Sequence, residues 1–279
     1  MKKLLLIMTL GFNLINVSYA DTFEVEKAKY KTVLIKENKS PQPYTNEKPP
    51  SGIESIQYNS NGRLLKAWFA LPPKPSTEKL PAVIYLHGGF SFAEQDFLDA
   101  KAFLDNGFAL LTPTFRGENG NDGNFELFYG EVDDALASLD WLQKNKNVDR
   151  NRIFIFGHST GGALSDLTSL YKKDGVLLSG SSGSLYPPQV FTAWSTIIPF
   201  NPEEQKEIIL RTFILNLTSM NRKHIAYLGE KDTSPEILNA YKKIIDKAHA
   251  PLEIKVVSGD HFSSLHNAIQ QFIQEIKKY

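Results

Sequence analysis

Short apolar runs alternate along this chain with longer segments. The short runs are typical of buried strands, and the longer segments have the apolar spacing of helices. The runs predict strands at residues 53–58, 64–70, 82–86, 108–112, 153–156, 176–179, 224–228 and 253–257. The longer segments predict helices at residues 93–105, 131–144, 163–171 and 265–276, and one that begins near Ser234 and Pro235.

This alternation predicts an α/β fold. Strand, helix, strand units place their strands parallel, and helices then cover both faces of the sheet. The first two runs flank Asn59-Ser60-Asn61-Gly62, a turn signal, so we expect them to form an opening hairpin. The pattern as a whole gives a mainly parallel sheet of roughly eight strands. With 279 residues, 42% of them hydrophobic, the chain suits one large domain.

Two stretches interrupt the alternation. Residues 21–51 are polar and rich in lysine and proline, which predicts a surface leader, and we assign this leader no chemistry. The main domain is then expected at residues 52–279. Between residues 180 and 222 the pattern lapses, which indicates a small helical insertion over the carboxyl edge of the sheet.

Residues 1–20 differ in kind from the rest. Lys2 and Lys3 precede an apolar run at residues 4–15, and Ser18-Tyr19-Ala20 has the small residues of a cleavage site. This predicts a secretory signal peptide cleaved after Ala20 and an exported protein, periplasmic or secreted. An uncleaved anchor is the alternative, which the shortness of the run disfavours. We expect no stable membrane insertion after cleavage.

Charge and cysteine content exclude several classes of protein. The 31 basic and 31 acidic residues balance, and no basic cluster marks a nucleic-acid surface, so we expect no nucleic-acid partner. The chain has no cysteine. This excludes disulfides, thiolate metal ligands and lipid attachment through a terminal cysteine. The oligomeric state stays open.

The segment at residues 152–162 has the pattern of a nucleophile elbow. Gly157-x-Ser159-x-Gly161 lies between an apolar strand run and a helical segment. A serine at so tight a turn has strained backbone angles and leaves no room for β-carbons two residues to either side. The amino end of the following helix favours an oxyanion beside the serine. Ser159 is the candidate nucleophile, and a glycine-rich turn with an idle serine is the alternative.

A serine nucleophile needs a base, and the base needs an orienting group. His261 follows the last predicted strand and Asp232 follows the one before, so both are expected at the carboxyl edge of the sheet. The chain order Ser159, Asp232, His261 is the order of α/β-hydrolases. Glu230 and Asp260 are the rival carboxylates for the third place.

His87-Gly88-Gly89-Phe90 follows a predicted strand, where an oxyanion loop belongs. The hole would consist of the backbone N–H of Thr160 and an N–H from Gly89 or its neighbour. Each such donor is typically worth roughly a hundred- to a thousandfold in rate. A simple glycine turn is the alternative.

Other residues near these motifs are open to more than one interpretation. We expect His87 and His158 to be supports rather than second bases, and residues 116–123 to form a hydrogen-bonded loop rather than a calcium site. A group of aromatic residues is expected either to line an acyl pocket or to pack the insertion against the core. These are Phe90, Phe191, Trp194, Phe200 and Phe213.

Together these motifs resemble the α/β-hydrolase superfamily, and within it the catalytic domain of prolyl oligopeptidase-like serine hydrolases. The resemblance covers residues 52–279. It rests on His87-Gly88-Gly89, Arg116-Gly117, Gly157-His158-Ser159-Thr160-Gly161-Gly162, residues 229–232 and Gly259-Asp260-His261-Phe262. It implies the α/β-hydrolase fold and a Ser159, Asp232, His261 triad. In the family the position after the two glycines is often proline, which has no N–H, so the resemblance implies Gly89 as the oxyanion donor. This chain departs from that pattern, with Phe90 in place of the proline.

The resemblance leaves the substrate class open. Large family members carry a β-propeller and acidic residues that bind a peptide amino terminus, for which this chain has no room. A looser likeness to dienelactone-hydrolase-like and esterase members points to small esters, although without cysteine a thiolate nucleophile is excluded.

The sequence therefore predicts an exported serine hydrolase that cleaves an ester or amide bond through an acyl-enzyme, without a cofactor or metal. A small-molecule ester is the expected substrate, and a short peptide is the alternative. A non-catalytic binding protein with the same fold is the alternative from another class.

Overall fold

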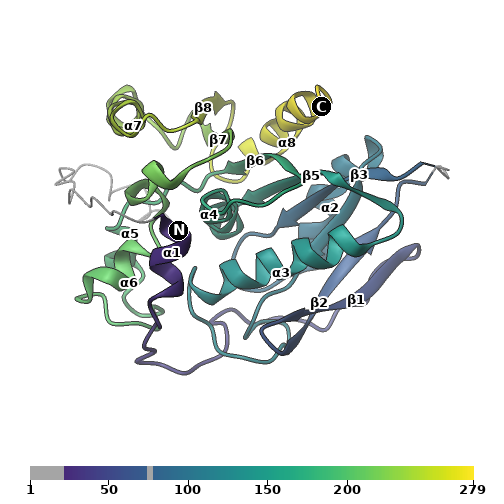
Figure 1. The fold of residues 1–279 in the computed structure, drawn as a ribbon, viewed down its shortest axis with the longest axis horizontal. Coiled ribbons are helices and arrows are strands. Elements are labelled where there is room, and N and C mark those ends of the chain that lie inside the picture. Colours follow the sequence, from purple (N-terminus) through teal and green to yellow (C-terminus); the bar gives the residue numbers. More distant parts are fainter. Residues whose placement is uncertain (1–21, 74–77) are drawn as a thin grey trace.

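A computed structural model describes residues 22–73 and 78–279 of the chain, so the predicted signal peptide lies outside the described residues. An eight-stranded sheet with the order β1-β2-β4-β3-β5-β6-β7-β8 forms its centre (Figure 1). β2 is antiparallel to both β1 and β4, and the other neighbours are parallel. This confirms the predicted hairpin and mainly parallel sheet. The strands are β1 (Ile53–Ser60), β2 (Arg63–Ala70), β3 (Leu80–Leu86), β4 (Ala109–Pro113), β5 (Val148–His158), β6 (Val176–Ser182), β7 (His224–Gly229) and β8 (Leu252–Val257).

Helices cover both faces of the sheet, as the alternating pattern predicts (Figure 1). Helices α3 and α4 pack on one face, and α2 and α8 pack on the other. Ser234 caps α7 by accepting from Ile237 N–H, and Pro235 is its first residue. The helices are α1 (Phe23–Ala28), α2 (Glu94–Asp105), α3 (Gly130–Lys144), α4 (Ser159–Thr168), α5 (Val190–Ala193), α6 (Gln205–Ile209), α7 (Pro235–Ala248) and α8 (Ser264–Ile276), with short 3₁₀ turns η2 (Phe213–Leu215) and η3 (Leu217–Ser219).

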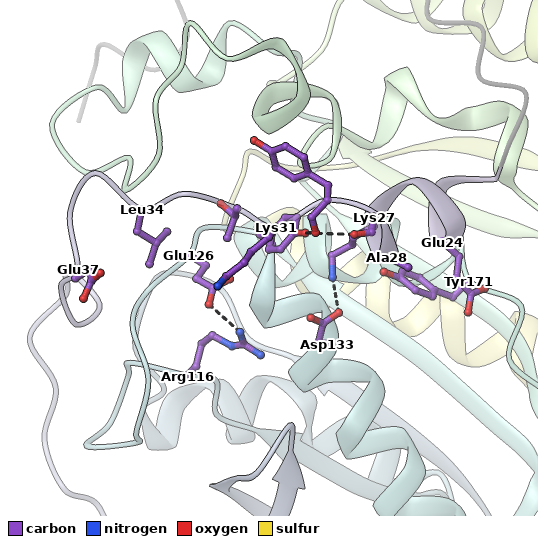
Figure 2. A pocket seen from close by; sticks show the side chains of 13 residues that line it. Glu24, Lys27, Ala28, Lys31, Leu34, Glu37, Arg116, Glu126, Asp133 and Tyr171 are labelled. Atoms are coloured by element: carbon purple, nitrogen blue, oxygen red, sulfur yellow. Dashed lines mark hydrogen bonds and ion pairs between the residues drawn. The ribbon is translucent and has the colours of Figure 1, made fainter.

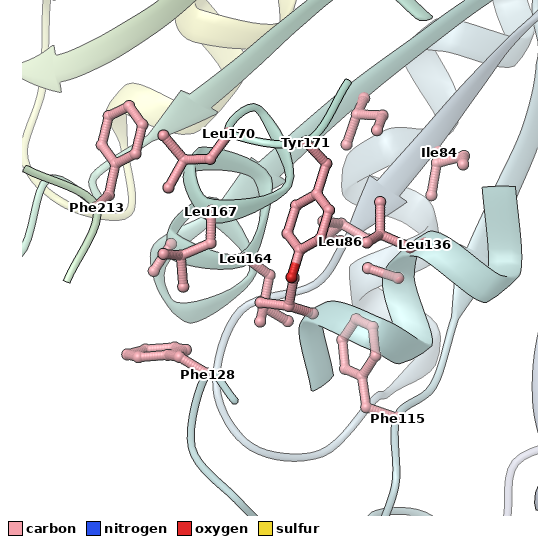
Figure 3. Close-up of a cluster of buried hydrophobic side chains, with 14 of the residues drawn as sticks. Ile84, Leu86, Phe115, Phe128, Leu136, Leu164, Leu167, Leu170, Tyr171 and Phe213 are labelled. Carbon is pink, nitrogen blue, oxygen red and sulfur yellow. The ribbon is translucent and has the colours of Figure 1, made fainter. Parts of the chain in front are cut away.

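The core has two halves, one on each face of the sheet. Along β3, Ile84 points to the α3 and α4 side, whereas Val83 and Tyr85 point to the α2 and α8 side. Figure 3 shows the first half, where side chains of α3 and α4 such as Leu136 and Leu167 lie over the sheet. Each fully buried large apolar side chain contributes about 1.5–3 kcal/mol to folding. The central strands are therefore held by apolar packing on both faces of the sheet.

Two predicted boundaries around the elbow are wrong. β5 begins at Val148 rather than residue 153, because the buried Val148 pairs with Leu80 although its polar neighbours face solvent. α4 begins at Ser159 rather than residue 163, because close packing holds the glycines of its first turn in helical geometry. Because glycine is a poor helix former, the sequence pattern predicted that this helix begins only after Gly161 and Gly162.

The leader and the insertion, which interrupt the alternating pattern, are both packed onto the domain. After β6, the insertion contains α5, α6, η2 and η3, as expected for a small helical segment. The leader contains α1, whose Phe23 is fully buried and lies edge-on to Tyr171. Leu34 of the leader forms a β-bridge with Phe200 of the insertion. The leader thus follows the surface and contacts the insertion.

Candidate active site

The elbow has the backbone that its glycine spacing predicts. β5 ends at His158, α4 begins at Ser159, and Ser159 has a φ of 54°, which is strained for a residue with a side chain. A Cβ on Gly157 would lie 2.1 Å from the Gly161 carbonyl oxygen, and a Cβ on Gly161 would lie 2.1 Å from the Leu86 carbonyl oxygen. The expectation that no β-carbon fits at either position is confirmed.

The structure brings Ser159 and His261 together across 102 residues of sequence. Ser159 Oγ lies 2.9 Å from His261 Nε2, a hydrogen-bond distance. Burial lowers the pKa of His261 below its ordinary value, although Asp232 acts in the opposite direction. The imidazole is therefore neutral at pH 7, and Nε2 can accept the Ser159 proton.

Asp232 lies in the loop that follows β7 and acts on His261 through its charge. Burial raises the pKa of Asp232, and the imidazole lowers it. Within the described residues, no hydrogen bond joins the Asp232 carboxylate to the ring, and the buried Oδ2 has no partner. Triad bonds are often loose before substrate binds. The buried Oδ2 of Asp232 is therefore free to accept a hydrogen bond from the imidazole.

The two rival carboxylates are engaged elsewhere. Glu230 Oε1 accepts from the hydroxyl of Ser258 at 3.0 Å and from Gly259 N–H. Asp260 Oδ1 accepts from the Ser263 hydroxyl at 2.7 Å and also from the Ser263 N–H. These two hydrogen bonds from Ser263 lower the pKa of Asp260 to about 2. Both side chains belong to exposed loops. The geometry therefore favours Asp232 as the orienting acid.

The predicted oxyanion residues meet beside the nucleophile. The Thr160 hydroxyl donates to the Gly89 carbonyl at 2.5 Å. Neither the Gly89 nor the Thr160 backbone N–H donates to another described residue, so both stay available to a ligand. Phe90, the neighbour, donates its N–H to Gln42 Oε1 at 2.9 Å. Of the two candidates in the loop, Gly89 has the free donor.

His87 and His158 both make hydrogen bonds of a supporting kind. His87 Nε2 lies 2.8 Å from Glu118 Oε1; burial lowers its pKa, but Glu118 outweighs burial and raises it to about 9. His158 Nε2 donates to the His261 carbonyl at 2.9 Å, and burial lowers the pKa of His158 to about 4. His87 thus ties the oxyanion loop to the 116–123 loop, and His158 holds the backbone of His261.

Aromatic side chains gather beside Ser159, and only some of them were predicted. Trp194 contacts Phe90, with ring centroids 5.8 Å apart, and also packs against Phe128 and Tyr186. Phe191 is not part of this group, because it is buried edge-on to Phe200 within the insertion. Similarly, Phe213 is buried and packs on His224, the first residue of β7.

Sequence reasoning missed two contacts with the reactive groups. Tyr186 Oη lies 3.1 Å from Ser159 Oγ, although nothing in its sequence context, before Pro187 and Pro188, distinguishes it from a packing residue. The leader also reaches the oxyanion loop, because the Ser40 hydroxyl donates to the Phe90 carbonyl and Gln42 accepts its N–H. The sequence analysis assigned the leader no chemistry and did not predict this contact with the oxyanion loop, because nothing in the composition of the leader indicates it.

Two cavities lie apart from Ser159. One of about 610 Å³ opens between the leader and the start of α3 (Figure 2). Four of the charged groups that line it form ion pairs, Lys27 with Asp133 and Arg116 with Glu126. Another, of about 730 Å³, lies between leader residues 39–44 and loop residues 117–122. Both are bounded by the leader, and neither includes the Ser159 and His261 side chains.

Over the described ranges, no helix combines the length and apolar character that a membrane span requires.

Comparison with known proteins points to one family. The family model described as BD-FAE matches residues 69–252. The Uncharacterized peptidase YtmA of Bacillus subtilis is 33% identical over 119 residues, 42% of this chain and 46% of that protein. The Uncharacterized protein RP471 of Rickettsia prowazekii is 46% identical over 61 residues, 22% of this chain and 25% of that protein. The chain thus matches less than half of the length of these curated relatives.

Solved structures share the fold at low sequence identity. A Mycobacterium tuberculosis puromycin-hydrolyzing peptidase superposes with a TM-score of 0.68 and 16% identity, over 82% of this chain and 40% of that chain. Esterase Est22 superposes with a TM-score of 0.63 and 17% identity, over 82% of both chains. This chain therefore corresponds to one part of the peptidase but to most of the esterase.

Proposed function

The chain belongs to the BD-FAE family and has the α/β-hydrolase fold, and from this premise we propose that it is a serine hydrolase. The observation that carries the proposal is the 2.9 Å contact between Ser159 Oγ and His261 Nε2 at a strained elbow. Serine is a weak nucleophile unless such a base takes its proton. A strained backbone that keeps this geometry is typical of a functional site.

The proposed reaction is acyl transfer in two steps. Ser159 Oγ attacks the substrate carbonyl while its proton passes to His261 Nε2, and the leaving group departs with that proton. Water then attacks the acyl-enzyme, gives a proton to His261, and the carboxylic acid is released as Oγ regains a proton. Asp232 stabilises the imidazolium in both steps. The backbone N–H groups of Gly89 and Thr160 bind the oxyanion.

We propose an ester of a small molecule as the substrate. Esterase Est22 is matched over 82% of its own length, whereas the peptidase is matched over 40%. The aromatic side chains of Phe90, Trp194 and Tyr186 beside the nucleophile suit an apolar acyl group. Activity on short peptides is the second candidate, which the peptidase relative and the peptidase structures favour.

We also propose that the protein is exported, on the evidence of the signal-like pattern at residues 1–20. Mass spectrometry of the protein recovered from a producing cell should give Asp21 as the first residue. Retention of Met1 in the exported protein would contradict cleavage at Ala20.

The test of the proposed function compares Ser159→Ala with Ser182→Ala. The second variant is a matched control, because it removes a buried hydroxyl that has no hydrogen-bond partner among the described residues. A fluorophosphonate should label the wild type and the control but not Ser159→Ala. Turnover of a p-nitrophenyl ester should follow the labelling. Aminoacyl-anilide turnover on the same enzymes separates esterase from peptidase action. Full labelling of a folded Ser159→Ala protein would place the nucleophile elsewhere.

A further inference from the structure

Tyr186 is the second side chain that touches the nucleophile. Its hydroxyl lies 3.1 Å from Ser159 Oγ, on a segment that follows β6. Its ring stacks on Phe128 with an interplanar angle of 18° and meets Trp194 edge-on at 5.3 Å between centroids. Aromatic contacts on both sides leave the ring little freedom. The hydroxyl is thus held at the nucleophile.

Proton positions decide the direction of this hydrogen bond. Burial raises the pKa of Tyr186 to about 12, so the phenol keeps its proton at neutral pH. The single Ser159 proton goes to His261 Nε2, which lacks a proton when the neutral ring carries its proton on Nδ1. Only the lone pairs of Oγ are left for Tyr186. Tyr186 therefore donates to the nucleophile oxygen.

We propose that Tyr186 is a catalytic residue that promotes deacylation by donating a hydrogen bond to Ser159 Oγ as that oxygen leaves. The proposal rests on the serine mechanism above and adds a group to it. In deacylation the water oxygen bonds to the acyl carbon, the C–Oγ bond breaks, and the electron pair of that bond moves to Oγ. His261 then delivers to Oγ the proton that it took from water.

The benefit of this donor differs between the two steps. In the acyl-enzyme, Oγ is an ester oxygen and a weak acceptor, and it becomes a strong one as it gains negative charge. In the free enzyme, Oγ is a hydroxyl oxygen that already accepts from Tyr186. In deacylation, the hydrogen bond from Tyr186 is weak in the acyl-enzyme and strong in the transition state. In acylation it is already present in the free enzyme, so it gains less strength on reaching the transition state. The donor therefore lowers the barrier of deacylation more than that of acylation.

Tyr186→Phe tests this difference, since it removes the hydroxyl and keeps the ring. With a p-nitrophenyl ester, kcat should fall roughly ten- to a hundredfold, the range for a hydrogen bond to a charged group. KM should fall with it, so that kcat/KM changes less than about threefold. A burst of p-nitrophenol, equal to the enzyme concentration, should appear. Tyr227→Phe is the matched control, because its buried hydroxyl has no hydrogen-bond partner in the part of the chain that the structure describes.

Three outcomes decide the matter. A burst with unchanged kcat/KM supports the proposal, whereas an equal loss of kcat and kcat/KM without a burst, or no loss at all, overturns it. If Tyr186→Phe does not fold, 3-fluorotyrosine at position 186 replaces it; as a slightly stronger donor it should raise the deacylation rate, and a lower or unchanged rate overturns the proposal. Labelling that survives Ser159→Ala would instead overturn the proposed function itself.

Discussion

Asp232→Asn tests the acid of the proposed triad with almost no change of shape. Asp232 Oδ2 is buried without a partner, and the charge of the carboxylate raises the pKa of His261 against the effect of burial. Asparagine keeps the size but presents an N–H group and no charge. It therefore favours the tautomer with the proton on Nε2, which cannot take the proton of Ser159.

The size of the loss separates two roles for Asp232. If the carboxylate accepts the imidazole Nδ1–H during the reaction, its replacement should cost roughly ten-thousandfold in kcat, as for the acid of a serine protease triad, or about 5 kcal/mol. If it acts only as a partly exposed charge, as its present contacts allow, the loss is about 1 kcal/mol and under tenfold. We expect the larger value, because the buried Oδ2 has no donor among the described residues and is free to accept the imidazole Nδ1–H during the reaction.

The assay is ester turnover by proteins whose folding has been verified by circular dichroism. Glu230→Gln and Asp260→Asn are the matched controls. Each should lose less than about threefold, since both carboxylates are exposed and bond to serine hydroxyls, Glu230 to Ser258 and Asp260 to Ser263. A folded Glu230→Gln protein that loses more turnover than Asp232→Asn would refute the assignment and shift the acid by two residues. A loss under tenfold in Asp232→Asn would refute the hydrogen-bonded role.

Two predictions concern pH. Because burial lowers the pKa of His261, the acidic limb of kcat/KM for the wild type should have its midpoint below 6.5, and a midpoint above that value would contradict a desolvated base. Burial also raises the pKa of Glu131 from 4.5 to about 8, so the native state keeps a proton that the unfolded chain loses, and native stability falls as pH rises through that interval. In urea unfolding, Glu131→Gln should have a free energy of unfolding about 3 kcal/mol above that of the wild type at pH 7. At pH 5 the two should differ by less than about 1 kcal/mol. If this difference in stability does not depend on pH, Glu131 titrates normally and the prediction is wrong.

The sequence by itself determined the features that depend on local chemistry. Apolar runs bounded by glycine and proline specified the sheet, because a buried strand has to be apolar on both faces. Gly157 and Gly161 specified the elbow, because any side chain there would overlap backbone atoms. Ser234 and Pro235 specified the start of α7, since a cap and its first turn are adjacent in sequence. Each of these signals lies within a few residues of its effect.

Only the tertiary structure decided which side chains meet around Ser159. Tyr186 lies 27 residues from the nucleophile, and Gln42 lies 48 residues from Phe90. Three carboxylates were candidates for the partner of His261. Glu230 bonds to Ser258 and Asp260 bonds to Ser263, whereas Asp232 acts on the ring through its charge. Apolar periodicity identifies the side of an element that is buried, but the partner of a side chain depends on how distant segments pack, and packing is a property of the folded chain as a whole.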